Sequence, residues 1–151
     1  MELRRMKISD LRFFNKVRKQ SSQYLHDSTN FTIEENINWF IKYDPIYFIL
    51  SNDNQDIGYF RTSNWNNNTV YLGLDIAEEY RGKGYARKAY NLMFDYLKKQ
   101  NISTIFLEVL QTNKRAIHIY ESLGFEITEI KQFKTTKSIK MKLNINNDDR
   151  I

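Results

Sequence analysis

Two glycines that flank a lysine, Gly82 and Gly84, lie in the segment YRGKGYARKAYNLMFDYL, between an apolar stretch and an amphipathic one. Glycine has no Cβ, so a ligand can approach the backbone closely at these positions. The first turn of a following helix has unpaired N–H groups, and these donors and the helix dipole favour an anion. Arg81, Lys83 and Arg87 add positive charge. The residue types therefore predict an anion site, with phosphate as the expected ligand.

Two well-known phosphate loops do not match this turn. A Walker A loop has the spacing G-x-x-x-x-G followed by Lys and Ser or Thr, which is absent here. A dinucleotide fingerprint needs a third glycine, but Ala86 stands at that position and predicted antiparallel strands precede it. The two glycines alone are equally consistent with a plain strand-to-helix turn, so a second feature has to decide.

The second feature is the segment LEVLQTNKRAIHIYESLGF, whose pattern predicts strand, loop, helix and strand. Asn113 and Tyr120 are seven residues apart, which on an α-helix is about two turns, roughly 10 Å along one face. The small residue Ala116 lies between them and leaves that face open. A slender ligand fits along such a face.

Together the two segments resemble the GNAT-type N-acetyltransferase superfamily. The run from Arg81 to Ala86 is similar to that family's R/Q-x-x-G-x-G/A acetyl-CoA loop. The second segment is similar to its N-x-x-A-x-x-x-Y-x-x-x-G-F pattern, carried here by Asn113, Ala116, Tyr120, Gly124 and Phe125. The resemblance implies that an acetyl group passes directly from acetyl-CoA to an amine in a ternary complex. It also implies a splayed sheet, in which strands 69–76 and 103–110 part and the pantetheine arm lies between them.

The resemblance also assigns the coenzyme contacts. Main-chain N–H groups of the glycine loop bind the pyrophosphate, and main-chain groups of Leu74 and Ile76 bind the pantetheine as an added strand would. Asn113 bonds the pantetheine from the other side. The predicted loop residues are Arg81, Gly82, Lys83, Gly84, Tyr85, Ala86 and Arg87.

Two residues are candidates for proton transfer. Tyr120 occupies the position of the family's usual general acid, and a tyrosine pKa of about 10 suits protonation of a departing thiolate. The alternative is a core tyrosine whose hydroxyl is satisfied. Glu108 is the candidate base, because a glutamate in the same LEV setting has that proposed role in the ribosomal-protein N-terminal acetyltransferases that this chain resembles. Apolar neighbours are expected to bury it partly and make it more basic; the alternative is a structural carboxylate paired with Lys or Arg.

The amine acceptor is indicated by the N-terminal segment. The segment from Arg18 to Phe40 is similar to the start of acetyltransferases that act on nucleotide-linked amino sugars, so we expect a 4-amino sugar nucleotide as acceptor. Protein N-terminal or lysine amines and polyamines remain alternatives, as does a non-catalytic acyl-CoA-binding module. His26, Arg61 and Asp75 are candidate acceptor contacts. Their plainer readings are a solvated loop histidine, a surface arginine, and a carboxylate that caps or pairs with Arg81.

The elements that must position these residues follow from periodicity and turn signals. They predict an α+β fold in the order β-α-α-β-β-β-α-β-α-β-β, with a mixed, mostly antiparallel sheet of about seven strands and about four helices. Ser9 is a candidate N-cap, Thr32 and Glu35 form a capping box, and the segment SNWNNN is expected to turn. Residues 1–145 are expected to form one domain, followed by a polar tail or linker start at 146–151.

Composition limits the class of protein. The chain has 151 residues, 41% of them hydrophobic, a net charge of +5 and no cysteine. Disulfides, Cys–zinc sites and a cysteine acyl-enzyme are therefore excluded, and no metal centre is predicted. We expect a cytoplasmic protein without a signal peptide or membrane partner. Because the lysines are scattered, no nucleic-acid partner is expected. A homodimer stays open.

Overall fold

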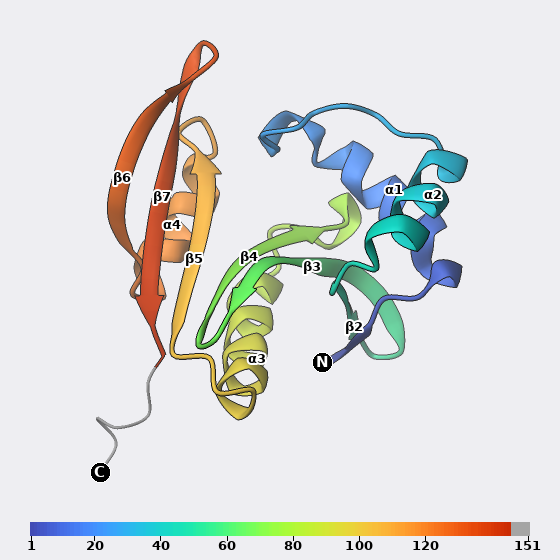
Figure 1. Ribbon diagram of the computed structural model, residues 1–151, viewed down its shortest axis with the longest axis horizontal. Coiled ribbons are helices and arrows are strands. Elements are labelled where there is room, and N and C mark those ends of the chain that lie inside the picture. Colours follow the sequence, from blue (N-terminus) through green and yellow to red (C-terminus); the bar gives the residue numbers. More distant parts are fainter. Residues whose placement is uncertain (146–151) are drawn as a thin grey trace.

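The computed structural model describes residues 1–145, so the predicted tail at 146–151 lies outside the described residues. A seven-stranded sheet in the order β1-β2-β3-β4-β5-β7-β6 carries helices on both faces (Figure 1). The predicted order of elements and the α+β class are confirmed. The elements are β1 (Glu2–Arg5), α1 (Leu11–Gln20), α2 (Ile33–Tyr43), β2 (Phe48–Asn52), β3 (Gln55–Asn66), β4 (Thr69–Ile76), α3 (Tyr85–Lys99), β5 (Thr104–Leu110), α4 (Lys114–Ser122), β6 (Glu126–Phe133) and β7 (Thr136–Asn144).

Each face of the sheet has its own apolar core. On one face, α3 and α4 pack against the sheet through buried residues such as Met93 and Tyr120. On the other, α1 covers the β2–β3 end through Phe14 and Val17, with Tyr59 of β3 beneath them. Successive side chains of β2 and β3 point to opposite faces of the sheet, and both faces are buried there. Apolar residues therefore occur on both faces of these strands.

The sheet opens between its two central strands. β4 and β5 pair in parallel over only three residues each, and this pairing ends at Tyr71 and Phe106. Beyond that point β4 pairs only with β3, and β5 pairs only with β7. The two strands diverge visibly in Figure 1. The predicted splay is therefore confirmed, and it leaves main-chain groups of Gly73 to Ile76 without a neighbour on the β5 side.

Two local predictions were wrong. Ser63 to Asn66 belong to β3 rather than to a turn, because the strand continues through a register shift and the chain reverses only at Asn67 and Asn68. Ser9 is not an N-cap. It lies in a 3-10 turn whose geometry is set by Asp10, which accepts the Lys7 N–H at 2.8 Å. The asparagines of the segment SNWNNN predicted a longer turn than the backbone makes.

The capping box at the start of α2 is confirmed. The Thr32 hydroxyl accepts the Glu35 N–H at 3.1 Å, and the Glu35 carboxylate accepts the Thr32 N–H at 3.0 Å. Two helix-terminal donors are satisfied in this way, and the Glu35 side chain is fixed in direction.

Removing the cap should weaken the fold. Thr32→Ala is expected to lower the free energy of unfolding by about 1 kcal/mol, because the Glu35 N–H loses its partner. Urea denaturation followed by circular dichroism measures this. Thr32→Ser is the matched control, since it keeps a hydroxyl acceptor. Equal stability of the alanine variant and the parent would show that the box contributes nothing.

Candidate functional site

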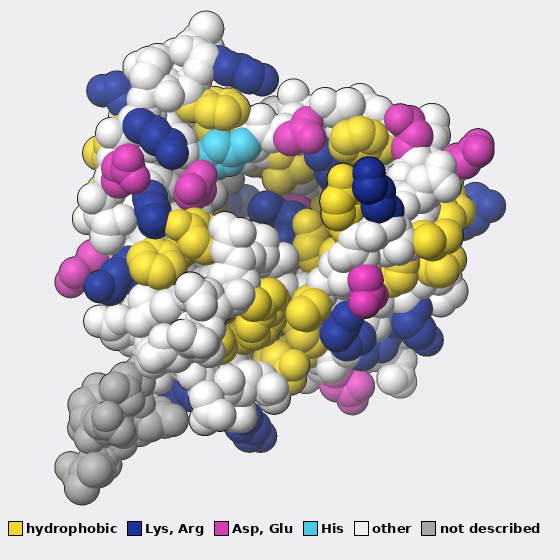
Figure 2. All heavy atoms as spheres, in the orientation of Figure 1, with side chains coloured by type: hydrophobic (Ala, Val, Ile, Leu, Met, Phe, Trp, Pro, Cys, Tyr) yellow, Lys and Arg dark blue, Asp and Glu magenta, His cyan; other side chains and the backbone are white. Residues whose placement is uncertain are grey.

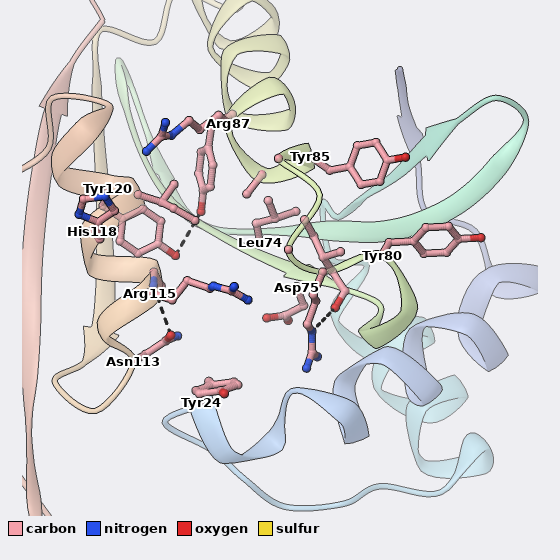
Figure 3. Close-up of a pocket in the computed structure, with 18 of the residues that line it drawn as sticks. Tyr24, Leu74, Asp75, Tyr80, Tyr85, Arg87, Asn113, Arg115, His118 and Tyr120 are labelled. Atoms are coloured by element: carbon pink, nitrogen blue, oxygen red, sulfur yellow. Dashed lines mark hydrogen bonds between the residues drawn. The ribbon is translucent and has the colours of Figure 1, made fainter.

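A groove of about 450 Å³ occupies the place where β4 and β5 part, and we call it the β4–β5 groove. Figure 3 shows side chains from β4, from the start of α3 and from α4 converging on it. It is lined by Ser21, Tyr24, Leu74, Asp75, Ile76, Tyr80, Arg81, Gly82, Gly84, Tyr85, Ala86, Arg87, Tyr90, Asn113, Arg115, Ala116, His118, Ile119 and Tyr120. All the predicted coenzyme-binding residues except Lys83 are brought together here.

The glycine loop has the backbone that the sequence analysis required. Gly82 and Gly84 have φ of +74° and +80°, a conformation that strains any residue with a Cβ. A Cβ at Gly84 would meet nothing within 4 Å, so the surrounding space is open to a ligand. Gly84 is also the N-cap of α3 and has no side chain with which to cap it. The N–H groups of the first turn therefore point outward as donors for an anion.

Arg81 and Lys83 of the glycine loop make different contacts. Arg81 donates from Nε to the Ile76 carbonyl at 2.9 Å and from Nη2 to the Ser21 hydroxyl at 3.1 Å. It therefore ties the loop to the end of β4 and to the C-terminus of α1. Lys83 is not part of the groove lining, and its Nζ lies over the Tyr80 ring, 5.9 Å from the ring centroid.

Tyr120 lies on the wall of the groove and is 9% exposed. Its hydroxyl is 3.3 Å from that of Tyr90, as the dashed line in Figure 3 shows. Burial raises the pKa of the Tyr120 hydroxyl, so the phenol stays protonated at neutral pH. On the same helix, Asn113 is the N-cap, and its Oδ1 accepts the Ala116 N–H at 3.4 Å. Its Nδ2 group remains as a donor to the groove.

A second cavity of about 660 Å³ lies on the α1–α2 side, and we call it the α1–α2 cavity. Figure 2 shows the molecular surface hollowed between that side and the β5–β7 side. It is lined by Phe14, Arg18, Tyr24, Leu25, His26, Asp27, Phe31, Glu35, Asn36, Asn38, Trp39, Tyr47, Arg61 and Glu108. Because Tyr24 lines both spaces, the groove and the cavity share a border.

An ion pair marks the same border. Arg61 lines the cavity and Asp75 lines the groove. Arg61 donates to the Asp75 carboxylate from Nε at 3.0 Å and from Nη2 at 3.5 Å. The prediction that Asp75 pairs with Arg81 was wrong. In the β3–β4 register Arg61 lies opposite Gly73, so Asp75, two residues further along β4, is its diagonal neighbour on the same face.

His26 is not a solvated loop residue. Its Nε2 lies 2.8 Å from the Ser138 hydroxyl of β7, and its ring packs against Phe133 of β6 at 4.9 Å between centroids. The loop after α1 therefore reaches across the opening of the sheet to the β6–β7 hairpin. Burial lowers the pKa of the His26 imidazole.

Glu108 is exposed, and the expectation of partial burial was wrong. Its neighbours Leu107 and Val109 point into the apolar core, so Glu108 on the alternate face points into the α1–α2 cavity. It forms no ion pair among residues 1–145, so the structural alternative of a Lys or Arg partner is not realised there.

The sequence analysis missed several residues of the groove. Arg115 approaches the glycine loop, 3.7 Å from the place of a Cβ on Gly82. His118 of α4 also lines the groove. Tyr24 lines it from a short 3-10 turn after α1. None of these follows from a local pattern, because each depends on how α4 and the α1–α2 connection lie against the sheet.

The family model described as "Acetyltransferase (GNAT) family" matches residues 11–125. Spermidine N(1)-acetyltransferase of Escherichia coli is 43% identical over 53 residues, which cover 34% of this chain and 28% of that protein. Ribosomal protein bS18-alanine N-acetyltransferase of Escherichia coli is 37% identical over 61 residues, 40% of this chain and 41% of that protein. The matched stretches thus span well under half of these relatives.

The fold is shared over a longer span. The structure of Vibrio cholerae spermidine N-acetyltransferase in complex with CoA and spermine has a TM-score of 0.84 at 24% identity, covering 95% of this chain and 94% of that one. Within residues 1–145, no helix combines the length and apolar character that crossing a bilayer needs. No group of three or more His, Asp or Glu side chains in that range is arranged to hold a metal ion.

The contact between His26 and the hairpin should depend on pH. Because the folded-state pKa of His26 lies below its unfolded value of about 6.5, the unfolded chain takes up this proton first as the pH falls. The stability of the neutral contact is therefore present above about pH 6.5 and is lost as the pH falls toward the lower folded pKa.

Urea denaturation between about pH 7.5 and about pH 5.5 measures this loss. The slope of stability against pH should be smaller in His26→Gln than in the parent. Parallel slopes for the two proteins would mean that His26 does not titrate with folding.

Proposed function

The chain belongs to the GNAT acetyltransferase family, and from this premise we propose that it transfers the acetyl group of acetyl-CoA to a primary amine of a polyamine, or of another alkylamine with a second positive charge. The observation that carries the choice of acceptor is the charge of the α1–α2 cavity. Three carboxylates reach its lining, from Asp27, Glu35 and Glu108. Both of its arginines are already held in ion pairs, Arg18 with Asp27 of the same lining and Arg61 with Asp75.

The ion pairs of the two arginines argue against a pyrophosphate-bearing acceptor. Arg18 donates to the main-chain carbonyls of Thr29 and Asp27, and its guanidinium lies 3.8 Å from the Asp27 carboxylate. Arg61 is paired with Asp75. Phosphate recognition in proteins relies on cations that are free to make charge-assisted hydrogen bonds. The cavity is thus better suited to a cation, and we replace the sugar nucleotide expected from the sequence with a polyamine.

Aromatic rings add to this suitability. Trp39 stacks on Phe14 at 5.5 Å and meets Tyr47 at 5.4 Å, and all three rings line the cavity. Ring faces attract ammonium groups and pack against methylene chains. The names of the relatives support the same class, since two of the three proteins compared act on spermidine.

The groove suits acetyl-CoA. The open N–H groups at Gly84 and the start of α3 would hold the pyrophosphate, and the free edge of β4 at Leu74 and Ile76 would pair with the pantetheine amides. Asn113 would donate from the α4 side. The thioester is then directed toward the border between the groove and the cavity.

The reaction needs two proton transfers. The amine nitrogen attacks the thioester carbonyl, so that a C–N bond forms and the C–S bond breaks. Glu108, directly or through a water, accepts the proton that the amine must lose. Tyr120 donates its hydroxyl proton to the departing thiolate. Its burial in the groove wall keeps that proton in place until the thiolate forms.

Tyr120→Phe tests the acid role. We expect kcat to fall by about a hundredfold, with little change in the Kd of acetyl-CoA, because only the proton donor is removed. Steady-state thiol release and calorimetric titration measure the two quantities. Tyr96→Phe is the control, since Tyr96 packs on Phe48 at 5.1 Å and does not line the groove. An unaltered kcat in the first variant would remove Tyr120 from the mechanism.

A panel of acceptors tests the substrate class. Spermidine, putrescine, an N-terminal alanine peptide and a 4-amino sugar nucleotide would be compared by thiol release from acetyl-CoA. We expect kcat/KM to be highest for spermidine. A preference for the peptide or the sugar nucleotide would overturn the polyamine assignment, and tight acetyl-CoA binding without turnover of any amine would favour a non-catalytic binding module.

Glu35→Gln tests the cavity charge. The amide keeps the helix cap but removes the carboxylate, so KM for spermidine should rise about fivefold while kcat changes little. Glu34→Gln, next to it on the same helical turn and outside the cavity lining, is the matched control. Equal KM values for the two variants would show that Glu35 does not meet the acceptor.

A further inference from the structure

The Arg61 guanidinium lies directly over Gly73 in the neighbouring strand. A Cβ built on Gly73 would come within 2.5 Å of Arg61 Nη2, 2.6 Å of Cζ and 2.9 Å of Nη1. All three distances are shorter than van der Waals contact. The side chain of Arg61 can therefore take this position only because residue 73 has none.

A second glycine of the sheet shows what is particular about Gly73. A Cβ on Gly58 would meet the main-chain oxygen of Asp75 at 2.5 Å, so the approach of the strands themselves requires glycine there. At Gly73 the obstacle is only the end of a flexible side chain. The fold can therefore accommodate a Cβ at residue 73 if the Arg61 side chain moves. Because glycine inside a strand weakens that strand, its presence here calls for a reason. What requires glycine at this position is the placement of the guanidinium.

The two members of the Arg61–Asp75 ion pair face different spaces. The Asp75 side chain is 6% exposed and lines the β4–β5 groove, whereas the Arg61 side chain is 38% exposed and lines the α1–α2 cavity. A molecule in the cavity thus meets the guanidinium first, with its counter-ion behind it. In Figure 3 Asp75 lies between the α4 side chains and Tyr80.

We infer that Gly73 is a specificity-determining residue: by making room for Arg61, it turns the guanidinium end of the Arg61–Asp75 ion pair toward the cavity and selects acceptors whose second cation lies several bonds from the reacting amine. This inference rests on the proposed function. Near Arg61 the uncharged form of the reacting amine is favoured, since a like charge disfavours its ammonium. A second ammonium close to the first is repelled, whereas one further out lies among the carboxylates of Asp27 and Glu35.

The test is a double-mutant cycle in which acceptors of different length are compared. Ethylenediamine, putrescine, cadaverine and spermidine would be compared by kcat/KM in the parent, Gly73→Ala, Arg61→Met and the double variant. We expect the parent to favour spermidine over ethylenediamine by at least about tenfold. Gly73→Ala and Arg61→Met should both reduce this ratio severalfold, and Gly73→Ala should have no further effect on it once Arg61 is replaced.

Two controls keep the result interpretable. Ser63→Ala changes an exposed residue two positions from Arg61 on the same strand and should leave the ratio as in the parent. The ¹⁵N–¹H signal of the Arg61 Nε–H group, assigned by its loss in Arg61→Met, reports the ion pair without any substrate. We expect it to shift in Gly73→Ala and, as a reference for loss of the pair, in Asp75→Asn.

The outcomes separate the two claims. Turnover with an unchanged length preference in Gly73→Ala, or an Arg61 signal that does not move in that variant, overturns the role of Gly73 and leaves the proposed function standing. Absence of turnover with every diamine in the parent protein overturns the proposed function, and the selection of acceptors falls with it.

Discussion

The early end of pairing between β4 and β5 is the constraint on which the rest of the site depends. Three residue pairs hold the strands together, and each strand then follows its other neighbour. A free strand edge is normally a liability, because its N–H and C=O groups lack partners. Here the edge faces a groove whose other wall is α4. The same divergence creates the place for an extended ligand and sets Tyr120 beside it.

Charge is arranged around this opening from the anion site to the cation site. The start of α3 presents N–H donors and the positive end of a helix dipole. The Arg61–Asp75 pair lies at the border, and carboxylates of the α1–α2 cavity lie beyond it. A reaction that joins an anionic coenzyme to a cationic amine requires such a gradient. The net charge of +5 conceals it, because that number says nothing about where each sign lies.

The sequence predicted what depends on local chemistry. The glycine loop, the Thr32 capping box and the order of elements all follow from residues close in the chain. Contacts between distant elements could not be read in this way. The partner of Asp75 depended on strand register, the exposure of Glu108 on which face of β5 is covered, and the environment of His26 on a contact across 112 residues.

The long-range contacts share one physical role. His26 joins the α1–α2 connection to the β6–β7 hairpin, and Arg81 joins the glycine loop to Ser21 at the end of α1. The His26 contact crosses between halves of a sheet that its own hydrogen bonds connect over only three residue pairs, and the Arg81 contacts hold the glycine loop against the β1–β4 half. A split sheet loses ladder bonds where the ligands enter, so side chains must fix the distance between its halves there. The contact between His26 and Ser138 thus joins the two halves across the cavity.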